Sequence, residues 1–216
     1  GFTPAPGVRL VIAGRSGYES PTPGPRALLF DPKRDLLDAS LATSPVMSGP
    51  LALADIDGDG DLDLFVGGRC LPGQWPSPAS STVFLNDGGG FKADANWSQA
   101  FAGVGLVSGA AFADLDGDGR DDLLLAQEWG PIRLFRNAGN RFEDVTAAAG
   151  LEAFVGWWNG VATGDFENLV HFRRTTGPVD RQYRRRSGRD CGLDPGHVNL
   201  IAFVAIHKYG ARPGCY

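Results

Sequence analysis

The sequence predicts an all-β protein with the architecture of a partial β-propeller. Three observations predict this fold class: an internal repeat, short strand-like runs, and the lack of a sustained 3.6-residue period. Residues 54–64 and 113–123 match almost letter for letter, and their first aspartates, Asp55 and Asp114, are 59 positions apart. Gly, Asn and Asp turns separate the apolar runs between these copies. Short strands at regular spacing with such turns are typical of all-β arrays.

The third repeat unit predicts four strands, at 109–113, 122–126, 131–136 and 141–146. Four strands in a unit of about 51 residues are typical of a propeller blade, which buries its faces against neighbouring blades. A β-sandwich would accommodate the strands but would not explain the repetition. We therefore expect about two full four-stranded blades with two partial ones.

Further segments recur in step and set the expected domain boundaries. Residues 83–91 correspond to 134–142, and residues 11–15 correspond to 65–69. The expected divisions are the end of one blade at 7–47, full blades at 48–108 and 109–159, the start of a fourth at 160–168, and a non-repeat tail at 169–216.

Charge and composition change abruptly after residue 168. The 216 residues carry a net charge of −5, but the tail holds nine basic and three acidic side chains, against 11 basic and 22 acidic ones before it. All three histidines lie in the tail, which also holds two of the three cysteines. Because charge, His, Cys and repeat change together, we interpret the tail as a frameshifted or misjoined gene end, or as disordered sequence. Reading the coding DNA in its other frames tests this.

Both full copies carry an aspartate loop with the pattern D-x-D-x-D-G-x-x-D. Ca²⁺ takes six to eight oxygen ligands, which alternating carboxylates on a tight loop can supply. Gly60 and Gly119 would permit the sharp turn. The predicted metal ligands of the first loop are Asp55, Asp57, Asp59 and Asp63, with the backbone carbonyl of Asp61. Those of the second are Asp114, Asp116, Asp118 and Asp122, with the backbone carbonyl of Arg120.

The alternatives to calcium loops are weaker. An EF-hand loop needs a bidentate Glu at its twelfth position, where this chain has Val66 or Leu125. A solvated acidic turn would not require a recurring spacing, and carboxylates this close repel one another without a cation. The third copy keeps only Asp165 and Glu167, so we do not expect it to bind metal.

These loops, the period of 50–60 residues and the phrase at 109–114 resemble FG-GAP/VCBS repeats. Such repeats build the seven-bladed propeller of integrin α subunits and of many secreted bacterial proteins. Segments 67–76, 128–131 and 156–160 more specifically resemble the bacterial branch related to cartilage acidic protein, whose members often carry an ASPIC/UnbV domain. The resemblance implies calcium in both loops, an extracellular, periplasmic or cell-surface location, and a role in cell adhesion. Seven blades need roughly 400 residues, so we expect a fragment that depends on the other blades of a longer parent.

The sequence is compatible with two functions, one of a binding module and one of an enzyme. We expect a non-catalytic calcium-binding module that presents a face to a protein or glycan ligand. The alternative is part of a secreted calcium-dependent hydrolase or lyase that acts on polysaccharide through paired carboxylates. Residues 1–168 contain no histidine, which removes Ser-His-Asp and Cys-His chemistry there. The clustered aspartates are already assigned to calcium, so the binding module is favoured.

Tryptophans mark the expected ligand surface. Trp75 and Trp129 lie in predicted loops, where propellers present their binding faces. Trp157 and Trp158 could stack on a sugar, but neighbours in a strand face opposite ways, so we expect at least one in the core.

Other signals predict no site. The tail's Cys and His residues match no zinc spacing, and Cys70 has no histidine base nearby in sequence. The run at 184–186 is a single basic cluster in an acidic chain, so no nucleic-acid partner is expected. No run approaches the 18 apolar residues of a membrane span.

Overall fold

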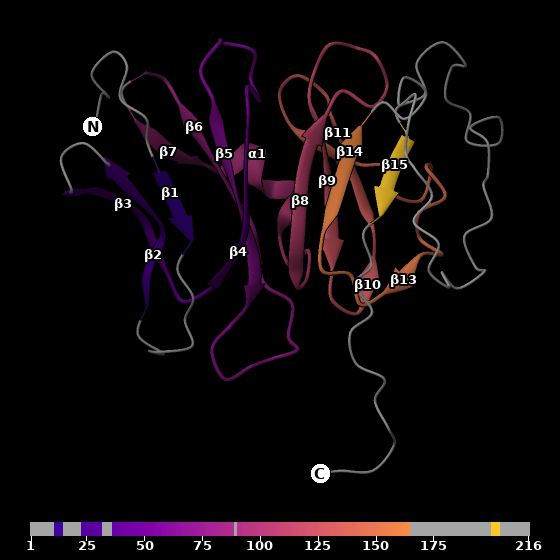
Figure 1. The fold of residues 1–216 in the computed structure, drawn as a ribbon, viewed down its shortest axis with the longest axis horizontal. Helices are drawn as coiled ribbons and strands as arrows, with labels where there is room; N and C mark the ends of the chain where they lie inside the picture. Colours follow the sequence, from indigo (N-terminus) through magenta and orange to yellow (C-terminus); the bar gives the residue numbers. More distant parts are fainter. Residues whose placement is uncertain (1–10, 15–22, 32–35, 89, 165–199, 204–216) are drawn as a thin grey trace, which may run out of the picture.

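The structure, a computed structural model, describes residues 11–14, 23–31, 36–88, 90–164 and 200–203 as a series of antiparallel β-sheets (Figure 1). The predicted all-β class is confirmed. Within these ranges the helical elements are α1 (Ala95–Ser98) and the 3-10 helix η1 (Gln99–Phe101). Neither is long and apolar enough to cross a membrane.

Two sheets have four strands each and the same strand order. The first, the β4–β7 sheet, consists of β4 (Met47–Ala54), β5 (Asp63–Cys70), β6 (Thr82–Asn86) and β7 (Phe91–Asp94). The second, the β8–β12 sheet, consists of β8 (Val107–Ala113), β9 (Asp122–Gln127), β11 (Arg133–Asn137) and β12 (Phe142–Asp144). The four strands predicted for the third unit are confirmed, with ends shifted by no more than two residues.

Smaller sheets flank these two. One consists of β1 (Val11–Gly14), β2 (Gly24–Asp31) and β3 (Leu36–Ser44), and another pairs β14 (Val161–Gly164) with β15 (Leu200–Phe203). Strand β10 (Gly130–Pro131) pairs with β13 (Val155–Gly156). Strands β1, β4, β8 and β14 lie side by side in chain order (Figure 1). This is how successive blades of a propeller are arranged.

The third aspartate loop and most of the tail lie outside the described residues. In the tail, the structure describes only β15, which pairs antiparallel with β14. The division of the chain into blades and tail at the expected boundaries stays a prediction, as does the origin of the tail.

The neighbouring strands β4, β8 and β14 approach one another closely at glycines, which have no side chain. A Cβ at Gly49 in β4 would lie 2.6 Å from the carbonyl oxygen of Val107 in β8. A Cβ at Gly109 in β8 would lie 2.8 Å from the Cα of Gly160, just before β14. The small residues of these strands therefore let each sheet pack directly on the next.

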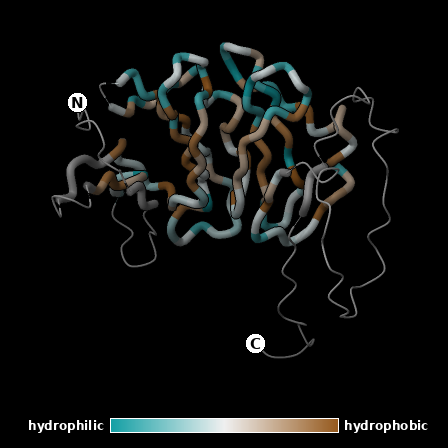
Figure 2. The backbone as a smooth tube through the Cα atoms, turned by 45° about the horizontal axis from the view of Figure 1, so that its top comes forward, coloured by the Kyte–Doolittle hydropathy of each residue, from teal (hydrophilic) through white to brown (hydrophobic). Residues whose placement is uncertain are grey.

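An aromatic cluster fills the space between the β4–β7 and β8–β12 sheets. The ring of Phe101 lies 5.2 Å from Phe65, 4.8 Å from Phe135 and 5.3 Å from Phe142, measured between centroids. Figure 2 shows the hydrophobic residues concentrated in the strands and the hydrophilic ones in loops at their ends. Phe101 comes from η1, so this short helical segment supplies the centre of the core.

The sequence did not predict α1 or η1, because four and three residues are too few to display a helical period. The start of α1 has a local cause: the Asp94 carboxylate accepts a hydrogen bond from the Trp97 backbone N–H at 2.9 Å. Such N-caps stabilise a helix by about 0.5–2 kcal/mol.

Polar side chains also cross between sheets. Arg26 in β2 is 2% exposed, and its guanidinium donates hydrogen bonds to the carbonyl oxygens of Val66, Gly67 and Ser80. Burial lowers the pKa of Arg26 to about 10. Asn137 in β11 makes a second such link, described below.

Candidate metal centre

The two aspartate loops occupy corresponding places in the two four-stranded sheets. Residues 55–62 connect β4 to β5, and residues 114–121 connect β8 to β9. Gly58, Gly60, Gly117 and Gly119 have φ angles of +80°, +94°, +80° and +83°. Side chains other than glycine rarely adopt this left-handed region. The sharp turns expected at Gly60 and Gly119 are confirmed, and two further glycines are needed for the same reason.

Each loop brings three predicted ligands together. One carboxylate oxygen from each of Asp55, Asp57 and Asp63 lies within 4.8 Å of the others. Asp114, Asp116 and Asp122 form the same arrangement in the second loop. We call these sets the first and second aspartate triads. In each, the last aspartate is the first residue of a strand and is buried, while the middle one is exposed.

The first aspartate of each triad shapes its own loop. The two carboxylate oxygens of Asp55 accept hydrogen bonds from the N–H groups of Gly58 at 2.8 Å and Gly60 at 3.0 Å. Asp114 accepts from Gly117 at 2.7 Å and Gly119 at 3.0 Å. The spacing of aspartate and glycine therefore encodes the turn as well as the carboxylate cluster.

The last aspartate of each triad ties the loop to the sheet. Asp63 accepts hydrogen bonds from the N–H groups of Ile56 and Asn86, each at 2.8 Å. Asp122 accepts from Leu115 at 3.2 Å and Asn137 at 2.9 Å. Each oxygen keeps lone-pair capacity beyond these bonds, because a carboxylate has about four acceptor sites.

The remaining predicted ligands lie outside the triads. The carboxylates of Asp59 and Asp118 accept hydrogen bonds from the N–H groups of Asp61 at 2.8 Å and Arg120 at 2.9 Å. The Arg120 side chain also pairs with Asp118 and donates to the carbonyl oxygen of Asn137 at 2.9 Å. The sequence pattern predicted only a backbone role for Arg120, and this side-chain role was missed. The assignment of these four residues as metal ligands stays a prediction.

Burial and mutual repulsion act against ionisation of the triads. Burial raises the pKa of Asp122 to about 6, although two backbone N–H donors oppose the rise. Burial likewise raises the pKa of Asp63 and, together with the neighbouring Asp59, that of Asp57. A divalent cation between the carboxylates would relieve both effects.

The donor set fits a hard divalent cation. The triads present carboxylate oxygens, which hard cations prefer. Two oxygens bound to one Ca²⁺ at 2.3–2.6 Å are at most about 5 Å apart, and the carboxylate oxygens of each triad lie within 4.8 Å of one another. The residues present therefore fit a bound Ca²⁺ ion.

Asn86 and Asn137 are positioning residues that sequence reasoning missed. Each donates its backbone N–H to the buried aspartate of its own sheet. The side chain of Asn137 also donates to the carbonyl oxygen of Ile56, at 2.9 Å, in the loop of the neighbouring sheet. Their recurrence at the same place in each unit was visible in the sequence, but the contact between loops was not.

The tryptophans lie as expected where the structure describes them. Trp158 is 9% exposed and belongs to a core cluster, whereas Trp157 is 55% exposed. Trp75 and Trp129 are also exposed. Cys70 is buried and contacts the sulfur of Met47 at 3.3 Å, which suits a structural residue. The cysteines and histidines of the tail lie outside the described residues.

The FG-GAP-like repeat family matches this chain twice, at residues 55–125 and 114–168. Each match begins at the first aspartate of a loop, Asp55 or Asp114, and together the matches span more than half of the chain. A search of curated proteins finds no match.

Proposed function

This chain belongs to the FG-GAP-like repeat family, and on that premise we propose that it is a calcium-binding, non-catalytic β-propeller module. In this proposal its blades present a face to a protein or glycan ligand in an extracellular, periplasmic or cell-surface setting. The observation that carries the calcium part is the pair of matching aspartate triads. A single acidic turn could arise from solvation, but two with the same hydrogen-bond pattern indicate a shared purpose.

Calcium is favoured over magnesium by the number of protein oxygens that each loop offers. Mg²⁺ demands near-ideal octahedral geometry and usually keeps several waters. Ca²⁺ accepts six to eight oxygens in a flexible arrangement. Each loop offers a triad, a fourth aspartate (Asp59 or Asp118) and a backbone carbonyl (Asp61 or Arg120), which suits the larger cation.

The ion would act on stability. An ion that binds the folded loop and not the open chain stabilises the folded state by mass action, by about 2.7 kcal/mol at 100 times its dissociation constant. Extracellular calcium modules have dissociation constants of about 10⁻⁴–10⁻³ M. Sites of this affinity fill only where free calcium is high, so the proposal of an extracellular, periplasmic or cell-surface setting and a role in adhesion requires calcium at that level.

The alternative, a calcium-dependent hydrolase or lyase acting on polysaccharide, has less support. Paired-carboxylate chemistry needs one acid and one base that flank the substrate. In the described ranges, the clustered aspartates hold their own loops through backbone hydrogen bonds. The buried Glu128 is held in an ion pair with Arg69. Neither arrangement leaves two free carboxylates facing one cleft.

Thermal unfolding of the full chain tests the proposal. We expect the melting temperature, followed by circular dichroism, to rise by about 10 °C between chelator and 10 mM Ca²⁺, from two sites and about 2–4 °C per kcal/mol. Asp57→Asn with Asp116→Asn removes one carboxylate charge from each triad and should abolish most of this rise. The fold itself should persist, because both side chains are exposed and Asn keeps an acceptor oxygen. Asp87→Asn with Glu152→Gln removes two acidic charges outside the triads and should preserve it.

A further pair of changes tests the ligands outside the triads. If Asp59 and Asp118 bind the ion, Asp59→Ala with Asp118→Ala should also reduce the calcium-dependent rise. If the melting temperature of the unmodified chain is the same in chelator and in 10 mM Ca²⁺, the proposal is refuted.

A further inference from the structure

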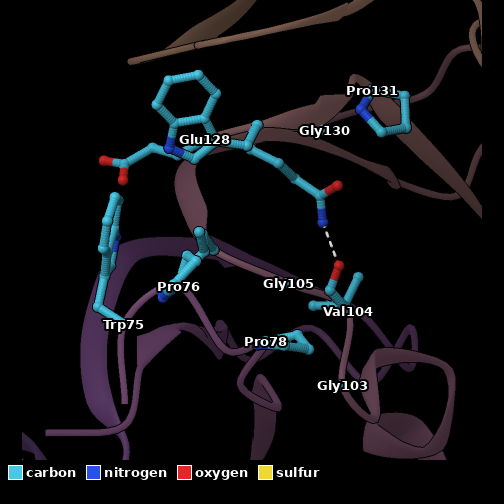
Figure 3. A pocket seen from close by; sticks show the side chains of 12 residues that line it. Trp75, Pro76, Pro78, Gly103, Val104, Gly105, Glu128, Gly130 and Pro131 are labelled. Carbon is cyan, nitrogen blue, oxygen red and sulfur yellow. Dashed lines mark hydrogen bonds between the residues drawn. The ribbon is translucent and has the colours of Figure 1, made fainter. Parts of the chain in front are cut away.

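A cleft lies at the end of the sheets opposite to the aspartate loops. Strands β5 and β9 begin at those loops, and the cleft is built from the segments that follow them, around Trp75 and around Glu128 and Trp129, together with residues 103–106 (Figure 3). Its volume is about 460 Å³, within the range of small-ligand sites. Because its walls come from the segments that follow β5 and β9 and from residues 103–106, it forms only when the two four-stranded sheets are packed together.

Exposed indole rings border the cleft. Trp75 is 55% exposed and Trp129 is 58% exposed. Trp129 packs on Trp157 with ring centroids 4.9 Å apart and planes inclined by 30°. Trp129 and Trp157 together form a contiguous exposed apolar surface, and such surfaces mark binding sites more often than single exposed rings do.

The backbone at Trp129 supports the same conclusion. Its φ is 61°, and within the described residues every other positive φ belongs to a glycine. A bulky side chain in this region costs of order 1–3 kcal/mol, and such strain clusters at functional sites. In this strained conformation Trp129 lines the cleft with an exposed ring, whereas a glycine at 129 would be relaxed but would present no ring.

Glu128 supplies a buried carboxylate to the lining of the cleft, and an ion pair holds it in place. Glu128 is 6% exposed and pairs with Arg69 of the neighbouring sheet, whose side chain is 39% exposed. Figure 3 shows Glu128 and Trp75 on one side of the cleft and Val104 on the other. The carboxylate accepts hydrogen bonds and the guanidinium donates them. Apolar faces and the Glu128 carboxylate therefore meet in the cleft, and the Arg69 guanidinium lies against that carboxylate.

This combination selects among ligand classes. A cationic ligand is disfavoured, because Arg69 already neutralises Glu128. A proline-rich peptide suits aromatic grooves but has few N–H donors for a carboxylate. A carbohydrate has C–H faces that stack on indole rings and hydroxyl groups that both donate and accept. We propose that this cleft binds an uncharged carbohydrate, with Trp75 and Trp129 as stacking platforms and the Glu128 carboxylate, positioned by Arg69, accepting hydrogen bonds from the sugar hydroxyls.

This inference rests on the ligand-binding part of the proposed function and does not depend on calcium chemistry at the triads. The test uses the full chain in 10 mM Ca²⁺, with tryptophan fluorescence titrated against the hexasaccharides of cellulose, xylan, mannan and chitin. We expect at least one of them to bind. Trp75→Ala and Trp129→Gly should each weaken that binding by about three- to tenfold, the loss expected for one aromatic stacking contact.

Matched controls separate a lost contact from a lost fold. Leu62→Ala removes a side chain as exposed as that of Trp75, 55%, at the opposite end of the sheet. It should leave binding unchanged. Arg69→Lys keeps the charge but not the planar fork and should weaken binding at an unchanged melting temperature. Trp129→Gly should melt no lower than the parent, because it relieves the backbone strain.

Several outcomes would overturn the inference. One is the absence of binding to all four hexasaccharides. Another is binding by both tryptophan variants that is as tight as binding by the unmodified chain. A third is tighter binding of a trimethyl-lysine or polyproline peptide than of any of the sugars. Sugar binding that persists when Asp57→Asn with Asp116→Asn abolishes the calcium-dependent rise would leave both proposals standing. If the unmodified chain binds the sugar but its melting temperature does not change with calcium, only the calcium proposal is refuted.

Discussion

Replacing Asn137 by alanine should destabilise the chain far more than the same change at Asn86. Both residues donate a backbone N–H to a buried aspartate, and both substitutions keep that bond. They differ in the side chain. The Nδ2 of Asn137 donates to the buried Ile56 carbonyl at 2.9 Å, whereas that of Asn86 donates to the Leu62 carbonyl at 3.3 Å in an exposed place.

The magnitude follows from these contacts. Asn137→Ala leaves the Ile56 carbonyl buried without this donor, which costs about 1–3 kcal/mol. It also removes the bond from the Gly139 N–H to Oδ1, 2.8 Å long and part-buried, worth about 1 kcal/mol. The free energy of unfolding should therefore fall by about 2–4 kcal/mol. Asn86→Ala should cost about 0.5 kcal/mol, because water replaces the exposed bond.

Urea unfolding of the full chain measures both values. Tryptophan fluorescence reports the transition, and the experiment is run in chelator and again in 10 mM Ca²⁺. A common slope against urea in all variants would show that stability alone has changed. Equal losses for the two alanine variants would refute the argument that the bond between neighbouring sheets stabilises their packing.

Three other predictions concern the loop backbone, a buried carboxyl and the core. Gly60→Ala should lower the free energy of unfolding by about 1 kcal/mol, because residue 60 has a positive φ. Gly160→Ala should change it little, because a Cβ there also meets no other atom and φ is not positive. Equal urea midpoints for the two variants would contradict this. In metal-free buffer, the free energy of unfolding of the unmodified chain, relative to that of Asp122→Asn, should fall as the pH rises from about 4 to 6. The reason is that the pKa of Asp122 in the folded state, about 6, exceeds the ordinary 3.8, so the folded state binds the proton more tightly than the unfolded state does. A relative free energy that rises over this pH range would contradict the argument. Phe101→Ala should cost about 3–5 kcal/mol, seen as a lower melting temperature, and a loss below about 1 kcal/mol would mean that the ring is not central to the core.

The parts of the fold that repeat along the chain could be predicted from the sequence. The strand predicted at 122–126 and the turn at Gly119 follow from a local pattern of apolar and turn residues, because a strand and its loop are specified within a few positions. The grouping of Asp114, Asp116 and Asp122 follows in the same way, since all three lie on one loop.

The contacts between sheets could not be predicted. The bond from Asn137 to Ile56 spans 81 positions, and the pair of Arg69 and Glu128 spans 59. Their residue types are ordinary for exposed positions, and only the packing of one sheet on the next brings them together. Arg26 is a clearer case, since an arginine in a strand predicts an exposed side chain. Yet the carbonyl oxygens of Val66 and Gly67 in β5 and of Ser80 in the loop before β6 hold it in the interior.

The long sequence separation of the Asn137–Ile56 bond has a consequence for folding kinetics. Each aspartate loop closes between adjacent strands, so its hydrogen bonds can form early and at low entropic cost. The bond between sheets can form only after both sheets exist, which places it late on the folding path. Weakening it should therefore leave the folding rate nearly unchanged and accelerate unfolding. In this chain, the contacts that sequence reasoning could not find are the ones that set how long the folded state lasts.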